Sequence, residues 1–250
     1  MKKIIPLLIL AASVCAETPL PPASQILAAA RAQLPPYPVS MTGTLKERAP
    51  NGFIKTVSVE MDLNWHATPP QATYRISDPK NDRFQTLEIQ WLETGPVFQC
   101  LENGQAVTNF NPHAEIQNLG VTWADLSFSF LWSTDAKTEE IKKRFGKDKY
   151  KLTIPRPGGN TLLLWVEKET GRMTRAEEMD PNGVRQKVID IKSVQKFDTL
   201  WMAKDIDIIR PQQGRHTSLR IDQLEVVFPK GGITTHRRQR RGAFCGSRAG

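Results

Sequence analysis

The chain has 250 residues, of which 39% are hydrophobic and 24% are charged, so it is too rich in apolar side chains for a wholly disordered protein. No run reaches the roughly 18 consecutive apolar residues that a membrane-spanning helix needs. The formal net charge of +8 comes mainly from the ends, because residues 17–235 hold 27 of the 34 basic and all 26 acidic side chains. This nearly neutral centre argues against a nucleic-acid-binding protein.

Residues 1–16 have the pattern of a secretory signal peptide. Two lysines precede a short apolar run, and small residues stand just before Glu17, which predicts export and cleavage after Ala16. An alternative uses Cys15 as the lipidated first residue of a lipoprotein, although residues 12–14 form a poor lipobox.

After such cleavage two cysteines remain, Cys100 and Cys245. An oxidising compartment allows a disulfide, but the Gly/Arg-rich surroundings of Cys245 give no packing signal for one. The cysteine spacing, without a paired CxxC, also argues against a zinc site.

A short helix is predicted over residues 24–34, followed by strands. Ser24 can cap the helix and Pro35 and Pro36 end it. Residues 53–65 then alternate strictly between apolar and polar side chains, which is typical of a half-buried antiparallel strand.

The same alternation predicts further strands, and turn dipeptides stand between them. The strands are expected at residues 87–91, 161–166, 184–194, 201–209 and 218–228. The turns include Asn51-Gly52, Asn103-Gly104, Gly158-Gly159, Thr170-Gly171 and Asn182-Gly183. The pattern indicates a meander of antiparallel strands in one sheet and one domain.

One strongly apolar segment breaks the two-residue period. Thr122 can cap a helix that runs to Trp132 with Asp125 in its first turn. Its apolar residues cover more than one stripe, so it needs cover on both sides, either as the plug of an ordinary core or against a bound apolar ligand.

Residues 236–250 form a basic tail with no apolar period and the run His-Arg-Arg-Gln-Arg-Arg. Such tails are usually disordered and solvated. The alternative is transient contact with an anionic membrane surface or another polyanion.

The sequence offers almost none of the known catalytic or cofactor-binding patterns. It lacks the Gly-x-Ser-x-Gly elbow, the His-Glu-x-x-His pair, a phosphate-binding loop and a dinucleotide fingerprint. Its four histidines, His66, His113, His216 and His236, have no metal-ligand spacing. We therefore expect no catalytic residue, no metal and no cofactor.

The acidic and the aromatic residues each raise one further functional interpretation, a hydrolase and an oligonucleotide-binding protein. Acidic residues alternate with apolar ones on strands, so solvent is their expected partner, although a hydrolase with an unmarked carboxylate pair stays open. Tryptophans could stack on oligonucleotides. Trp65, Trp91, Trp165 and Trp201 fall within apolar strands, which favours the core or a cavity wall.

Several segments, in order over roughly residues 38–229, resemble one family. Asp125-Leu126 and Phe130-Leu131-Trp132 resemble the "sDL...FL.W" segment of the outer-membrane lipoprotein-sorting proteins related to LolA. Residues 164–171, 176–183, 201–204 and 214–219 resemble later motifs of the same family. No lid arginine or release loop of LolA itself aligns with this chain.

The resemblance implies a mainly β fold: a single curled antiparallel sheet forming an incomplete β-barrel, with helices covering the open side and a hydrophobic cavity inside. In the LolA branch that cavity holds the acyl chains of lipoproteins in the periplasm, related half-barrels sense envelope stress, and the family has no catalytic residues. We expect a signal peptide at 1–16, a LolA-like half-barrel domain at 17–235 and a basic tail at 236–250.

The sequence thus favours a periplasmic, non-enzymatic carrier of lipid or lipoprotein acyl chains, with an envelope-lipid-sensing module as the alternative. Its expected partners are lipid or acyl chains, membrane-associated donor or acceptor proteins and, through the tail, the membrane, but no nucleic acid.

The alternation and the apolar segment predict the lining of the cavity. The candidate lining residues are Val57, Val59, Met61, Leu63, Trp65, Leu87, Ile89, Trp91, Leu126, Phe130 and Leu131. They could equally fill a closed core.

Overall fold

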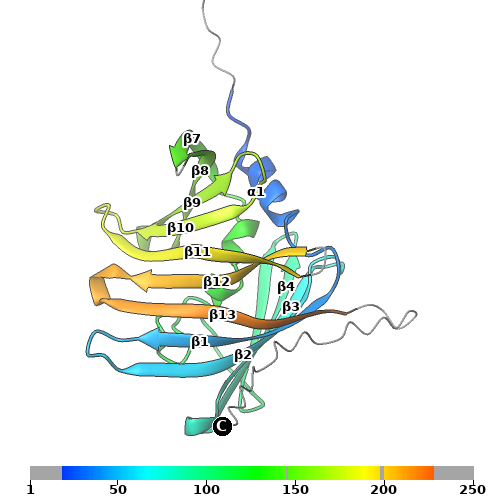
Figure 1. The fold of residues 1–250 in the computed structure, drawn as a ribbon, viewed down its shortest axis with the longest axis vertical. Coiled ribbons are helices and arrows are strands. Elements are labelled where there is room, and N and C mark those ends of the chain that lie inside the picture. Colours follow the sequence, from blue (N-terminus) through cyan, green and yellow to red (C-terminus); the bar gives the residue numbers. More distant parts are fainter. Residues whose placement is uncertain (1–18, 145, 198–199, 228–250) are drawn as a thin grey trace, which may run out of the picture. The chain divides into compact units, whose positions relative to one another are not determined.

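A computed structural model describes residues 19–144, 146–197 and 200–227 (Figure 1). The predicted signal peptide at 1–16, the lipidation alternative at Cys15, the basic tail and Cys245 lie outside the described residues.

In the described residues thirteen strands form one sheet. The order is β6-β5-β4-β3-β2-β1-β13-β12-β11-β10-β9-β8-β7, so nearly all neighbours in the sheet are also neighbours in the chain. The strands are β1 (Val39–Arg48), β2 (Ile54–Asn64), β3 (Gln71–Asp78), β4 (Arg83–Leu92), β5 (Gly95–Glu102), β6 (Gln105–Ala106), β7 (Lys137–Arg144), β8 (Lys147–Pro155), β9 (Thr161–Glu167), β10 (Met173–Met179), β11 (Arg185–Phe197), β12 (Leu200–Arg210) and β13 (Arg215–Val226).

The predicted fold class is confirmed. The protein is mainly β, and its meander of neighbouring strands forms one antiparallel sheet. In the described part of the chain the end strands, β6 and β7, each pair on one side only, so the sheet is not closed into a barrel.

The chain divides into two compact units. Unit 1 comprises residues 1–33 and 133–188, and unit 2 comprises residues 34–132 and 189–250. Each unit is described by itself below.

In unit 2 the two faces of β2 differ as the sequence predicts. Val57, Val59 and Met61 are at most 3% exposed, whereas Ser58 and Glu60 between them are exposed. The Asn103-Gly104 turn joins β5 to β6, and both residues have positive φ (48° and 81°). Asn-Gly is the sequence that this kind of tight hairpin favours, because neither residue pays a large steric cost there.

Unit 1 contains β7 to β10 and the helix α1 (Ala23–Arg31). The predicted helix over 24–34 is wrong at both ends: Pro22 is the N-cap residue, no described side chain caps the helix, and it ends at Arg31. Proline presets a φ suited to a helix start, and Pro35 forces the residue before it toward extended backbone. The predicted apolar side of α1 is confirmed, since Ile26, Leu27 and Ala30 are buried.

In unit 2 the predicted helix from Thr122 to Trp132 is two short turns. The Thr122 cap is confirmed: Asp125 N donates to Thr122 Oγ1 (3.2 Å) and Thr122 N donates to Asp125 Oδ2 (3.1 Å). The α-helical turn α2 (Trp123–Leu126) then stops, and Phe128 takes a positive φ of 49° before the 3-10 turn η2 (Ser129–Trp132). A straight helix would point part of its all-round apolar surface outward, whereas the break redirects the second turn.

The prediction that four tryptophans lie in the core or a cavity wall agrees with the burial of three of them. Trp91 and Trp165 are buried and Trp65 is half-buried, but Trp201 is 56% exposed. Trp201 is the second residue of β12, so its side chain lies at the end of a strand, where the sheet covers it less.

Gly43 provides a stability test of unit 2. The register between β1 and β13 shifts between Thr42 and Gly43, and a Cβ at Gly43 would overlap the backbone carbonyl of Arg220. We expect Gly43→Ala to lower the free energy of unfolding by about 2–3 kcal/mol, because backbone must move. Urea unfolding measures this, with Ser218→Ala on β13 as the control; equal stability of both variants would contradict the close approach.

Candidate functional site

The candidate site is an apolar face formed by β2, β3 and β4 of unit 2. Met61 lies opposite Tyr74, and Tyr74 lies opposite Leu87, so one row of buried side chains crosses the three strands. All the predicted lining residues on these strands point to this face and are at most 6% exposed. They are Val57, Val59, Met61, Leu63, Leu87, Ile89 and Trp91. We call this surface, together with Ala72, Tyr74 and Ile76 of β3, the apolar face.

Three tryptophans close one end of the apolar face. Trp65 follows β2, Trp91 is the second-last residue of β4 and Trp132 ends η2. Their ring centroids are 4.7 Å (Trp65–Trp91), 5.4 Å (Trp65–Trp132) and 4.6 Å (Trp91–Trp132) apart, within the range of favourable aromatic pairs. Trp132 was not among the predicted lining residues, because its position on η2 depends on the break at Phe128.

Two of these indoles carry buried donors without an acceptor. The Nε1 atoms of Trp65 and Trp91 have no hydrogen-bond partner among the described residues. Buried indole N–H groups normally find a partner. The tryptophan end of the apolar face therefore holds unused hydrogen-bonding capacity.

The two turns α2 and η2 contribute the rest of the predicted site. Leu126, Phe130 and Leu131 are at most 6% exposed, and Trp123 meets Tyr74 of β3 edge-on at 6.5 Å. With Trp132 these contacts place both turns against the apolar face. All eleven predicted lining residues lie in unit 2, and the three on α2 and η2 belong to turns that meet the apolar face through Trp123 and Trp132.

At the opposite end of β2 and β3 the same face becomes polar. Lys55 Nζ lies 3.2 Å from Asp78 Oδ2 and donates to the backbone oxygen of Gln117 (2.9 Å). Asn81 Nδ2 donates to Asp78 Oδ2 (2.7 Å). Hydrogen bonds from Asn81 and then Lys55 hold the pKa of Asp78 below its usual value, although burial opposes this.

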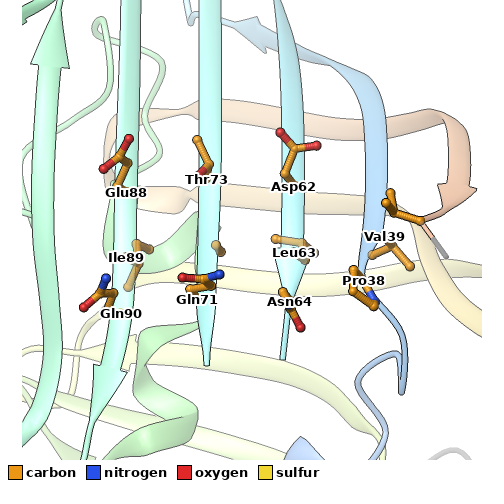
Figure 2. A pocket seen from close by; sticks show the side chains of 12 residues that line it. Pro38, Val39, Asp62, Leu63, Asn64, Gln71, Thr73, Glu88, Ile89 and Gln90 are labelled. Carbon is orange, nitrogen blue, oxygen red and sulfur yellow. The ribbon is translucent and has the colours of Figure 1, made fainter. Parts of the chain in front are cut away.

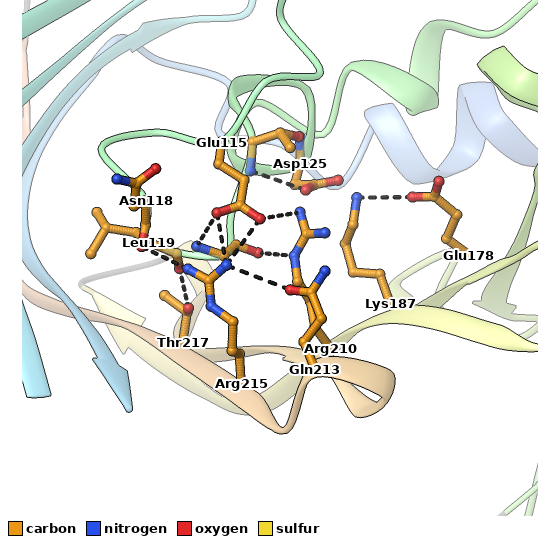
Figure 3. Close-up of polar contacts among 12 residues, drawn as sticks. Glu115, Asn118, Leu119, Asp125, Glu178, Lys187, Arg210, Gln213, Arg215 and Thr217 are labelled. Atoms are coloured by element: carbon orange, nitrogen blue, oxygen red, sulfur yellow. Dashed lines mark hydrogen bonds and ion pairs between the residues drawn. The ribbon is translucent and has the colours of Figure 1, made fainter. Parts of the chain in front are cut away.

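Two arginines hold the segment that leads into α2 (Figure 3). Arg215 of β13 bonds Glu115 (2.9 and 3.1 Å) and the backbone oxygen of Asn118 (2.6 Å), and it pairs with Glu47 of β1. Arg210 of β12 donates to the backbone oxygen of Gly120 (2.7 Å). We call this set the arginine anchor.

The arginine anchor was missed from sequence. Residues 214–219 stood out only as a resemblance, and nothing in their spacing indicates a partner about 100 residues earlier. The hydrogen bond to Glu47, followed by those to Glu115, raises the pKa of Arg215 despite its burial. The hydrogen bonds from Arg210 and Arg215 fix the segment 115–121 to β12 and β13, and Glu47 of β1 in turn holds Arg215.

A groove of about 460 Å³ lies on the other, polar face of β2, β3 and β4 (Figure 2). Of the predicted lining residues, only Leu63 and Ile89 border it, and its other wall residues on these strands are mostly polar. This hollow is distinct from the apolar face.

Features of other site classes are sparse in the part of the chain that the structure describes. No group of three His, Cys, Asp or Glu side chains there could hold a metal ion. Cys100 is a free, buried thiol whose pKa burial raises to about 11. Among those residues no helix is long and apolar enough to cross a membrane.

No family model and no curated protein sequence matches the chain. Solved structures do. A DUF1329 family protein from Desulfovibrio piger superposes with a TM-score of 0.68 at 13% identity, over 85% of this chain and 93% of the other. A LolA superfamily protein from Nitrosomonas europaea gives 0.67 at 14%, over 84% and 96%. A candidate outer-membrane lipoprotein-sorting protein domain from Vibrio parahaemolyticus gives 0.66 at 13%, over 84% and 93%.

These likenesses show the fold. The chain has a LolA-like fold, as the motif resemblance predicted, and it shares that fold with proteins to which it has little sequence identity.

Asp78 makes stability depend on pH. Because its folded-state pKa lies below the unfolded value, the carboxylate stabilises the fold above about pH 4, and this stabilisation is lost as the pH falls toward the lower folded pKa. We expect Asp78→Asn to lower the free energy of unfolding by about 1–3 kcal/mol at pH 7. The same substitution should weaken the decrease of that free energy as the pH falls to 3. Urea unfolding from pH 7 to 3 measures both, with Asp222→Asn, at an exposed carboxylate, as the control.

The arginine anchor predicts a large loss at one position of β13 and almost none at another. Arg215→Gln leaves the buried Glu47 carboxylate without its charged partner, so we expect a loss of about 2–3 kcal/mol. Arg220→Gln on the same strand breaks only an exposed pair with Asp222 and should change stability by less than about 0.5 kcal/mol. Similar unfolding midpoints for the two variants would contradict the anchor.

Proposed function

We propose that the protein is a non-enzymatic carrier that binds lipid or the acyl chains of a lipoprotein on the apolar face of unit 2. The observation that carries this proposal is the apolar face itself, which ends at the three tryptophans and is met by α2 and η2. The eleven predicted residues are proposed as the lining of the binding site.

The physical chemistry of the face suits such a ligand. Each buried CH₂ of an acyl chain contributes about 0.8 kcal/mol, so one chain of ordinary length supplies several kcal/mol after its ordering costs. The indole N–H groups of Trp65 and Trp91 offer donors to the ester or amide oxygens at the head of the chain. Apart from these two donors, the lining residues are apolar.

The LolA-like fold supports the proposal at the level of architecture. One of the similar structures is named as a candidate outer-membrane lipoprotein-sorting protein domain. With the signal-peptide pattern at residues 1–16, we place the carrier in the periplasm, where membrane-associated donor and acceptor proteins would be its partners.

A small-to-large substitution distinguishes a binding cavity from a closed core. Val59 is fully buried at the middle of the apolar face. If the face lines a cavity, Val59→Phe fills part of it, lowers the affinity for a fluorescent fatty acid at least about fivefold and leaves the unfolding midpoint unchanged. If the face is a packed core, the added volume costs about 1–3 kcal/mol of stability, which urea unfolding would reveal and which would overturn the proposal.

A charge on the covering turns should harm binding. We expect Phe130→Asp to reduce fatty-acid probe binding strongly, because an unpaired charge facing an apolar site is costly. Phe84→Asp is the matched control: Phe84 is 45% exposed on the polar face of β4, so the same substitution should leave binding intact. Circular dichroism establishes that both variants fold, and unchanged binding in folded Phe130→Asp would refute the role of η2.

The cargo itself is tested on protein purified from the cell envelope. Native mass spectrometry should find bound lipid or lipopeptide, and incubation with acceptor membranes should release it. Consistently empty protein that also ignores fatty-acid probes would defeat the proposal. Bound lipid that is never transferred, together with a stable protein partner, would favour envelope-lipid sensing instead.

A further inference from the structure

The groove on the polar face of β2, β3 and β4 is built from two cross-strand rows (Figure 2). In one row Asp62 lies opposite Thr73, and Thr73 lies opposite Glu88. In the next row three carboxamides stand side by side. They are Asn64, Gln71 and Gln90.

The surroundings of the groove carry excess negative charge. Asp62 and Glu88 line it, and the register adds Glu60 on β2 and Glu225, which lies opposite Ser40 beside Asp62. Arg75 of β3 lies opposite Glu60, and its guanidinium is bound to Asp62 at 2.6 Å. Glu88 is exposed and makes no hydrogen bond or ion pair with any residue that the structure describes. These positions thus hold four carboxylates and one guanidinium.

The last described residue of the chain lies at this groove. Val227 lines it, and its backbone N–H donates to the oxygen of Pro38, another wall residue (2.7 Å). The sequence that follows, residues 228–250, has six basic side chains and no acidic one. The chain therefore leaves unit 2 beside an acidic groove and continues as a basic segment.

The length of this segment keeps its arginines near the groove. Arg237 lies ten positions after Val227, so the backbone between them spans at most about 36 Å even when fully extended. Gly231 and Gly232 allow the backbone to reverse without steric cost. A tether this short gives the arginines a high effective concentration at the groove.

We propose that residues 236–241 of this same chain, His-Arg-Arg-Gln-Arg-Arg, dock in the groove. Guanidinium groups pair with the carboxylates of Asp62 and Glu88, and the carboxamide oxygens of the second row accept further N–H bonds from them. A docked arginine run is not available to an anionic membrane surface, so docking and membrane contact compete. The inference does not depend on what the apolar face binds.

The test places a nitroxide on Cys245, four residues beyond Arg241, in the full chain carrying Cys15→Ser. Cys100 does not compete for the label near pH 7, because burial raises its pKa to about 11 and the thiolate is the reactive form. The nitroxide broadens amide NMR signals close to it. We expect broadening at Asp62, Thr73 and Glu88 but not at Thr56, which lies six residues, or about 20 Å, away along β2.

Charge variants show whether the groove carboxylates are responsible. Glu88→Gln should lower the ratio of docked to undocked tail roughly two- to fivefold, as expected for an exposed ion pair, and the loss should shrink in high salt. Glu93→Gln, the same change at an exposed glutamate outside the groove, should leave the broadening as it was.

Mixing experiments distinguish docking of the chain's own tail from docking of the tail of a second copy, and show whether an anionic membrane displaces it. In one sample, nitroxide-carrying chain without ¹⁵N is mixed with ¹⁵N-enriched chain that carries no nitroxide, and we expect no broadening. Broadening in this mixture would mean that a second copy supplies the tail and would overturn the proposal. Adding vesicles with anionic lipid should relieve the broadening as the tail is displaced. Absence of groove broadening before vesicles are added, or equal broadening in Glu88→Gln and Glu93→Gln, would also overturn it.

Discussion

The structure of unit 2 depends on one constraint, the need to cover the apolar face of β2, β3 and β4. Strict alternation along these strands gathers large apolar side chains on one side of the sheet, where exposure to water would be costly. The turns α2 and η2 supply cover, and the tryptophan cluster joins the end of η2 to the ends of β2 and β4. The position of Phe128, with its left-handed backbone, decides which residues reach the face.

The turns α2 and η2, which cover the apolar face, must be held in place by interactions other than their own helical hydrogen bonds. Both turns have only four residues, and isolated helical turns of that length are unstable. The Thr122–Asp125 capping box fixes the start of α2, and the arginine anchor fixes the preceding segment through side-chain bonds to backbone oxygens. The proposed carrier role requires such an element, because the cover must be ordered in one state and able to yield to cargo in another.

The two faces of β2, β3 and β4 carry different chemistry. The apolar face offers area to a hydrocarbon ligand and two indole donors at one end, whereas the polar face offers carboxylates and carboxamides to a cationic one. Because side chains alternate across a strand, the same three strands can present both surfaces without sharing side chains between them. The binding proposed for one face and the docking proposed for the other are therefore separable by substitution.

The sequence by itself determined the period of the strands, the Asn-Gly turns, the cap at Thr122 and the membership of the apolar face, because these follow from local backbone preferences and from which side chains avoid water. The ordered motifs around Asp125 and Trp132 also sufficed to predict the LolA-like fold. Only the tertiary structure decided what depends on distant partners: the arginine anchor, whose groups are about 100 residues apart, the place of Trp132 beside Trp65 and Trp91, and the exposure of Trp201. The break at Phe128 belongs with these, since a local apolar pattern predicts a continuous helix and only packing against the sheet favours two turns.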